Sequence, residues 1–65
     1  MKTYTVNAEK HEGWWMLTSP DAPGAVSQVR VLSQAEDHAR EAIAFVMDVD
    51  ESDVEIRSGR GMPRK

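Results

Sequence analysis

A run of acidic residues near the C-terminal end of the chain is the first candidate for chemistry. Carboxylates are the ligands that Ca²⁺ binds, but an EF-hand loop also needs a glycine at its sixth position and a glutamate at its twelfth. The run has neither at that spacing. We therefore predict no metal site, and interpret the run as a solvated loop or as a surface that attracts a basic partner. The run consists of Asp48, Asp50, Glu51, Asp53 and Glu55.

The residues that enzymes use as bases and nucleophiles form no recognisable set. No HxxH or HExxH spacing joins the two histidines, His11 and His38. The chain has no cysteine, which excludes disulfides and thiolate metal sites. The serines lack a His-Asp partner set, and Glu9 and Glu12 are the only acids in the first 20 residues, too few to hold two metals. We predict that the protein is not an enzyme, with no catalytic residue and no cofactor.

Charge divides the chain into two parts. Residues 1–56 hold four basic residues against all eleven acidic ones, a net charge of −7, whereas residues 57–65 hold four basic residues and no acid. An acidic body repels nucleic acid and attracts basic proteins. The end of the chain has two glycines and a proline and no apolar periodicity. We therefore predict a domain over residues 1–57 and a disordered basic tail over residues 58–65.

A chain of 65 residues has room for one small core. A domain of this size buries only about 60% of the surface of its unfolded chain, and such chains usually add disulfides, a metal or a partner. Without cysteine, we expect a homo-oligomer or a protein partner to supply the missing stability. No apolar run approaches the roughly 18 residues of a membrane span, and the N-terminus lacks the apolar region of a signal peptide. We expect no membrane association and a cytoplasmic location.

Periodicity predicts the elements that must hold these residues. Polar and apolar residues alternate in four short segments, which is the pattern of strands with one buried face. A longer segment between the last two has apolar residues at helical spacing. The predicted fold class is α+β in the order β-β-β-α-β, an antiparallel meander followed by a crossover helix that covers one face of the sheet. The predicted strands span residues 2–10, 14–19, 25–32 and 53–57.

The predicted helix has a marked start and a marked core face. Ser33 and Glu36 fit a capping box at its start, and we expect the helix to end near Met47 or Asp48. The core stripe is rich in alanine, which would let the helix lie close to the sheet. The stripe consists of Ala35, Ala39, Ala42, Ile43 and Val46, and we expect Asp37, Arg40 and Glu41 to point outward.

The segment 20–24, Pro-Asp-Ala-Pro-Gly, connects the second and third predicted strands. Because Pro20 cannot donate a backbone hydrogen bond, the second strand must end before it. Pro23 and Gly24 fit the second and third positions of a type II turn, the third of which needs a positive φ. We expect a rigid connection that fixes where the third strand begins.

Two adjacent tryptophans on the second predicted strand must face opposite sides of the sheet. We expect Trp15 to face the helix together with Leu17, and Trp14 to lie with Met16 on the face that a single helix leaves open. An exposed Trp/Met pair is typical of an interface. The predicted partner or oligomer interface consists of Trp14, Met16, Val26 and Arg30.

The order of these motifs resembles the HicB-type antitoxin domain over roughly residues 3–57. The matching features are Tyr4 and Val6 in a Y-x-V strand, Trp14 and Trp15, Pro20-Asp21-Ala22-Pro23-Gly24, and Ala39-Arg40-Glu41-Ala42-Ile43 in the helix. The resemblance implies a partial ribonuclease-H-like fold without nuclease activity. It also implies binding to a small basic HicA-type RNase toxin, and assembly as dimers or higher oligomers. Many such domains precede a C-terminal DNA-binding domain; here we expect a stand-alone domain.

Two functions from different classes stay open. In the first, the protein is a non-catalytic protein-binding module, a HicB-like antitoxin that inhibits a HicA-type RNase toxin by occlusion. In the second, it is a stand-alone homo-oligomeric domain without a toxin partner. A neighbouring gene for a small basic protein would favour the first function. We expect nucleic acid to be a partner in neither case, although the basic tail has enough charge for weak, non-specific binding to phosphate.

Overall fold

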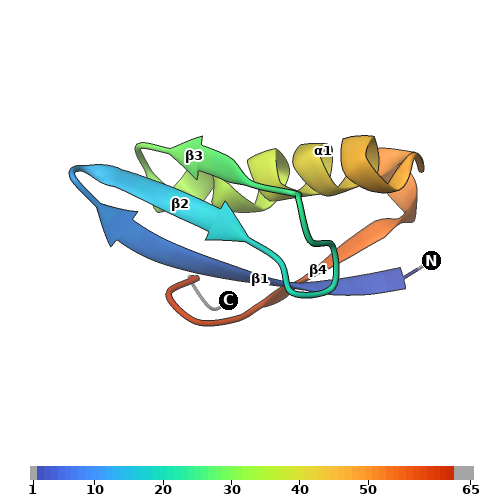
Figure 1. Ribbon diagram of the computed structural model, residues 1–65, viewed down its shortest axis with the longest axis horizontal. Helices are drawn as coiled ribbons and strands as arrows, with labels where there is room; N and C mark the ends of the chain where they lie inside the picture. The colour runs from blue at the N-terminus through green and yellow to red at the C-terminus, as the bar shows by residue number, and fades with distance from the viewer. Residues whose placement is uncertain (1, 63–65) are drawn as a thin grey trace.

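The protein, seen in a computed structural model that describes residues 2–62, forms a four-stranded mixed sheet with one helix packed on one face (Figure 1). The strand order is β3-β2-β1-β4, in which β1–β2 and β2–β3 are antiparallel and β1–β4 is parallel. The predicted α+β class and the order β-β-β-α-β are confirmed. The elements are β1 Lys2–His11, β2 Trp14–Thr18, β3 Ser27–Val29, α1 Ala35–Met47 and β4 Val54–Ser58, with 3₁₀ turns η1 Leu32–Gln34 and η2 Glu51–Asp53.

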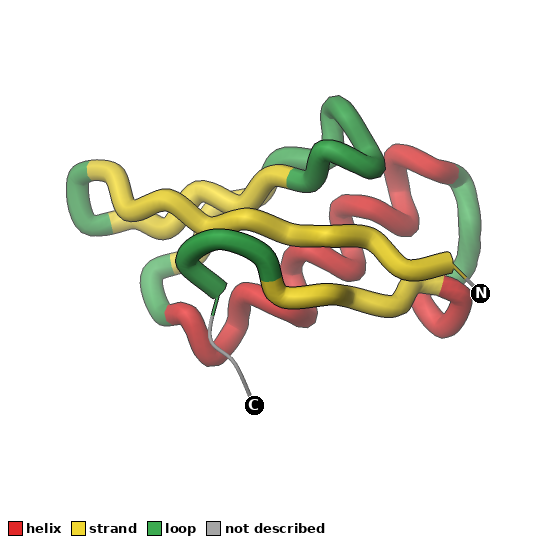
Figure 2. The backbone as a smooth tube through the Cα atoms, turned by 90° about the horizontal axis from the view of Figure 1, so that it is seen from below, coloured by secondary structure: helices red, strands yellow, loops and turns green. Residues whose placement is uncertain are grey.

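The central strand β1 divides its pairing between two neighbours. Its second half, residues 7–11, pairs with β2, and its first half, residues 2–6, pairs with β4. Each half of β1 is therefore paired on one flank only, and no described strand covers its other flank. A loop after β2 bonds to one of these flanks and the turn after β4 bonds to the other; in Figure 2 both lie beside the strands, with α1 behind them.

The loop after β2 consists of two consecutive turns. The N–H of Ala22 donates to the carbonyl of Ser19 (3.2 Å), and the N–H of Ala25 donates to the carbonyl of Ala22 (3.0 Å). In the second turn Gly24 has φ 99°, which confirms the predicted type II geometry after Pro23. The carboxylate of Asp21 accepts the backbone N–H of Thr5 (2.8 Å), so the loop also satisfies a donor on the uncovered flank of β1.

The chain after β4 packs against the sheet as far as Met62, in contrast to the disordered tail predicted over residues 58–65. The N–H of Gly59 donates to the carbonyl of Val6 (2.8 Å). The N–H of Ala8 then donates to the carbonyl of Arg60 (2.7 Å), so the segment continues along the second uncovered flank of β1. Hydrogen bonds between residues this far apart in the chain leave no periodic pattern in the sequence, so periodicity does not predict them.

Two residues close this C-terminal turn against the sheet. Gly61 has φ 79°, and a Cβ at this position would overlap the carbonyl of Ala8, so the close approach requires glycine. Met62 is buried and belongs to the core cluster. The domain therefore extends beyond the predicted boundary at residue 57 to Met62, and residues 63–65 of the predicted tail lie outside the described residues.

The core lies between α1 and one face of the sheet. Alternating residues of each strand point into it, as the period of two requires. The helix contributes small residues and Ile43, which is among the most completely buried side chains. Val46, expected in the core stripe, is exposed, whereas Ala44 is buried. The buried apolar residues of the sheet and helix are Tyr4, Val6, Ala8, Leu17, Val29, Val54, Ala35, Ala39, Ile43 and Ala44.

β3 is shorter than the predicted strand over residues 25–32. It pairs with residues 15–17 of β2, and Trp14 and Thr18 of that strand lie beyond the pairing. The type II turn holds Ala25 before the strand. After the strand, the chain enters η1 at Leu32. Apolar alternation alone does not reveal where the turn before the strand and η1 after it end the pairing.

The N-cap of the helix lies one residue later than predicted. Ser33, the expected cap, lies inside η1, and Gln34 occupies the N-cap position without a side-chain cap hydrogen bond. The predicted end is confirmed: α1 stops at Met47, and Asp48 follows in the left-handed conformation. Within the described residues, no helix is long and apolar enough to cross a membrane.

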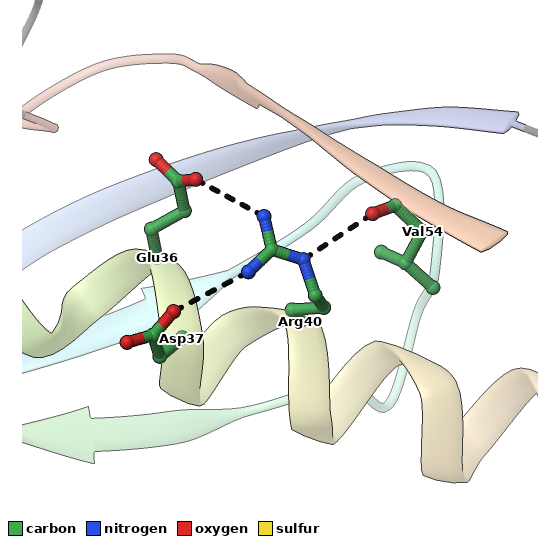
Figure 3. A network of polar contacts seen from close by, with 4 residues as sticks. All are labelled: Glu36, Asp37, Arg40 and Val54. Carbon is green, nitrogen blue, oxygen red and sulfur yellow. Dashed lines mark hydrogen bonds and ion pairs between the residues drawn. The ribbon is translucent and has the colours of Figure 1, made fainter. Parts of the chain in front are cut away.

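Arg40, expected to point into solvent, is instead partly buried and joins α1 to β4 (Figure 3). Its guanidinium donates to the carbonyl of Val54 (3.3 Å) and pairs with Glu36 (3.0 Å) and Asp37 (3.3 Å). Since the long side chain bridges two elements, its position follows from the tertiary packing and not from the helical pattern.

Candidate protein-binding surfaces

The two tryptophans of β2 face opposite sides of the sheet, as predicted. Trp15 packs against the core, with the Lys10 ammonium 5.7 Å from its ring centroid. Trp14 is 38% exposed on the open face. There the Arg30 guanidinium lies 4.3 Å from the Trp14 ring centroid, within the range of a cation–π contact. Trp14 therefore has an intramolecular partner that covers part of its ring.

Met16 lies on the same open face, beside a groove of about 240 Å³. Its cross-strand neighbours are Glu9 on β1 and Gln28 on β3. The C-terminal turn brings Arg60 to the opposite side of the groove. The open face around Trp14, Met16 and Arg30, called the Trp14 face below, therefore combines charges of both signs with a partly covered aromatic ring. The groove is lined by Asn7, Ala8, Glu9, Met16, Thr18 and Arg60.

Three of the four predicted interface residues come together on this face. Val26, the fourth, is 55% exposed but precedes β3, at the opposite end of that strand from Arg30. The three residues of β3 therefore separate Val26 from the Trp14–Arg30 contact. The role of these four residues in binding stays a prediction.

A second surface, at the C-terminal end of α1, was not singled out in the sequence. Phe45, the single phenylalanine of the chain, is 88% exposed there. It borders an open groove of about 440 Å³ together with Val49. We call this the Phe45 surface. The groove is lined by Glu41, Ala44, Phe45, Asp48, Val49, Asp50 and Glu51.

The way α1 ends shapes the Phe45 surface. Asp48 adopts φ 56°, a left-handed conformation that aspartate tolerates better than most residues. The N–H of Val49 then reaches back to the carbonyl of Ala44 (3.0 Å), the long bond of a Schellman motif. This reversal carries Val49 and the acidic residues after it to the same side as Phe45.

The charge around Phe45 is of one sign. Four carboxylates line the groove, and no basic side chain of the described residues does so. An apolar centre surrounded by polar groups is the usual anatomy of a protein interface, and the negative charge favours a basic partner. The sequence did contain a signal: Phe45 lies two residues after Ile43, about 200° around the helix from the core stripe.

The residues considered for catalysis are not assembled into a site. His11 and His38 are both exposed, one at the end of β1 and the other in α1. Ser19 is buried, and its hydroxyl has no hydrogen-bond partner among the described residues. Within residues 2–62, no three histidine, aspartate or glutamate side chains are grouped so that they would hold a metal ion. The surfaces described above are therefore the stronger candidates for function.

Comparison with protein-family models, curated proteins and solved structures gives no match for this chain. The resemblance to the HicB-type domain therefore rests on the sequence motifs alone.

Proposed function

We propose that this protein is a non-catalytic protein-binding module that acts as a HicB-type antitoxin. It would bind a small basic RNase toxin of the HicA type and block the RNA-binding or catalytic face of that toxin. The observation that carries the proposal is the Phe45 surface, where a ring that is 88% exposed is surrounded by four carboxylates. The mechanism requires no chemistry by this chain.

The charge of the Phe45 surface suits a partner that binds RNA. An enzyme that binds RNA presents positive charge to the phosphate backbone. A carboxylate-lined groove has the same sign of charge as that backbone, so it attracts the same face of the enzyme and accelerates association. Phe45 would supply the affinity once a pocket of the partner desolvates its ring. Inhibition then follows because antitoxin and RNA compete for one face.

The fold supports the proposal at a coarser level. The chain has the element order that the HicB-type resemblance implies, and its Pro-Asp-Ala-Pro-Gly segment forms the loop after β2. The finer assignment, a partial ribonuclease-H-like fold of the HicB type, is part of the proposal. A cytoplasmic location is also part of it, because the RNA substrates of such a toxin are found there.

The test begins with a small basic protein that copurifies with the tagged chain from its host. That protein is then made separately, and its cleavage of a labelled RNA is measured against increasing amounts of the wild type, Phe45→Ala and Val31→Ala. Val31 is the matched control, because it is an exposed apolar residue that lines neither groove.

We expect the wild type and Val31→Ala to suppress cleavage at stoichiometric amounts. Phe45→Ala should need about 30-fold more protein, the effect of losing one interface hot spot. Inhibition by Phe45→Ala equal to that of the wild type would remove the Phe45 surface from the mechanism. A copurified protein that binds but cleaves no RNA would contradict the antitoxin function while leaving the binding surface intact.

A further inference from the structure

Phe45 differs from the other aromatic residues of the chain because, within the described residues, no cation lies over its ring. Each of the other three rings has a lysine or an arginine at cation–π distance. A ring face attracts cations because it is the negative part of the ring quadrupole. The Phe45 side chain is 88% exposed, so its ring is open to a cation of another molecule. The intramolecular pairs are Lys2–Tyr4 (5.4 Å from cation to ring centroid), Lys10–Trp15 (5.7 Å) and Arg30–Trp14 (4.3 Å).

The carboxylates around Phe45 suit a cation that has more than one hydrogen-bond donor. Glu41 lies four residues before Phe45 in α1, and the Cβ atoms of such helical neighbours are about 5–6 Å apart. Because helical side chains lean toward the N-terminus, the Phe45 side chain leans toward Glu41. The chain reversal at the end of α1 brings Asp50 and Glu51 to the same groove. Carboxylates from two segments therefore border one groove with an exposed ring.

The basic residues of α1 do not supply this cation. Arg40 is the only arginine of the helix, and its guanidinium is bonded to Glu36, Asp37 and the carbonyl of Val54. Among the described residues, no basic side chain lines the groove. The negative charge at Phe45 is therefore not balanced by a cation of the described part of the chain.

We infer that the Phe45 surface binds an arginine side chain of the basic partner, with the guanidinium stacked on the Phe45 ring. The N–H groups at the edge of the guanidinium donate to the carboxylate of Glu41 and to a carboxylate of the segment after α1. This inference rests on the proposed function for the kind of partner, and it adds which side chain of that partner the surface recognises.

The chemistry of the surface favours arginine over lysine. A guanidinium is planar and weakly hydrated, so it can stack on a ring while its edge donates to carboxylates. An ammonium is a compact, strongly hydrated charge, and it loses more hydration when it approaches a ring. The protein itself has one pair of each geometry: the Arg30 guanidinium lies 4.3 Å from the Trp14 ring centroid, whereas the Lys10 ammonium lies 5.7 Å from that of Trp15.

Short peptides test the inference without the partner protein. Three glycine peptides with blocked ends are compared, which carry two arginines, two lysines or two citrullines. Each is titrated into the full-length ¹⁵N-labelled chain, and the dissociation constant and the position of the shifted amide signals are measured. The variants are Phe45→Leu, which keeps an apolar side chain without the ring, and Glu41→Gln. Glu12→Gln is the matched control, because it makes the same charge change at an exposed residue outside the groove.

We expect the arginine peptide to bind the wild type about fivefold more tightly than the lysine peptide, with shifts centred on residues 41–51. The neutral citrulline peptide should bind too weakly to saturate. Phe45→Leu should abolish the preference for arginine over lysine. Glu41→Gln should weaken binding of the arginine peptide about threefold, and Glu12→Gln should leave it unchanged.

Several results would overturn the inference. They are equal binding of the arginine and lysine peptides, no saturable binding of the arginine peptide, a preference for arginine that persists in Phe45→Leu, or shifts centred away from residues 41–51. An equal effect of Glu12→Gln and Glu41→Gln would also overturn it, because overall charge would then govern binding. The peptides contain no RNase, so this result is independent of whether a copurified partner cleaves RNA. Failure here and failure of the antitoxin function are therefore distinguishable.

Discussion

Two surfaces of this protein expose a large aromatic side chain, and they differ in what surrounds it. On the Trp14 face, the ring is partly covered by the Arg30 guanidinium, and the neighbouring groove has both Glu9 and Arg60. On the Phe45 surface, the ring is almost completely exposed and the groove is lined by carboxylates. The first aromatic is already used by the fold, whereas the second contributes little to it. We therefore expect the Phe45 surface, and not the Trp14 face, to bind the partner of the proposed function.

Of the substitutions that compare the two surfaces, the one at Phe45 is expected to have the largest effect on partner binding. Phe45→Ala should weaken binding of a basic partner by about 30-fold or more. The free energy of unfolding should change by no more than about 0.5 kcal/mol, because the side chain is exposed. Calorimetric titration and urea denaturation measure the two quantities on one sample. If Phe45→Ala lowered the stability but not the affinity, Phe45 would belong to the fold and not to the binding surface.

The second prediction concerns the turn that brings Arg60 to the Trp14 face. Gly61→Ala should lower the free energy of unfolding by about 2 kcal/mol, because the new Cβ overlaps the Ala8 carbonyl at a positive φ. Partner affinity of the folded fraction should be unchanged. Ser52→Ala, an exposed position in η2, serves as a control with little expected effect. If Gly61→Ala unfolded at the same denaturant concentration as the wild type, the C-terminal turn would not lie this close to β1.

The third prediction tests the charge of the Phe45 surface. Replacing Asp50 and Glu51 with lysine should reduce the association rate with a basic partner by about tenfold at low salt, and the difference should shrink as salt is added. Stopped-flow mixing at several salt concentrations measures this. The matched control replaces both Glu9 and Glu12 in the β1–β2 hairpin with lysine, which makes the same charge change away from the Phe45 surface. If that control slows association as much, net charge and not the Phe45 surface steers the encounter.

The smallest effect is expected at Trp14. Trp14→Ala removes the contact with Arg30 and should lower the free energy of unfolding by about 1 kcal/mol. Affinity for the basic partner should fall less than threefold, and thermal unfolding followed by titration checks both expectations. If Trp14→Ala weakens binding more than Phe45→Ala does, the interface predicted from sequence is the correct one.

The features that the sequence predicts are the ones controlled by local rules. The turn at Pro23 and Gly24, the opposite faces of Trp14 and Trp15, and the end of α1 near Met47 follow from φ preferences and strand or helix periodicity. Each of these depends on a few adjacent residues. The order of the elements follows from the same patterns.

The features that it misses depend on contacts between distant residues. Gly59 and Gly61 resemble linker residues in sequence, yet both are required because the chain passes too close to β1 for a Cβ. Arg40 is drawn toward β4 by the Val54 carbonyl, which helical spacing does not reveal. Phe45 becomes the centre of a groove because the chain reverses at Asp48 and returns Val49 to its side.

The most direct test of the Phe45 surface is a map of the residues that a basic partner touches. Amide chemical shifts of the ¹⁵N-labelled protein would be followed while the separately made partner is added, with attention to residues 41–51 and to residues 14–16 and 28–30. We expect the largest changes and line broadening to centre on Phe45, Val49 and Asp50. Changes centred on Trp14, Met16 and Arg30, with residues 41–51 unaffected, would contradict binding at the Phe45 surface.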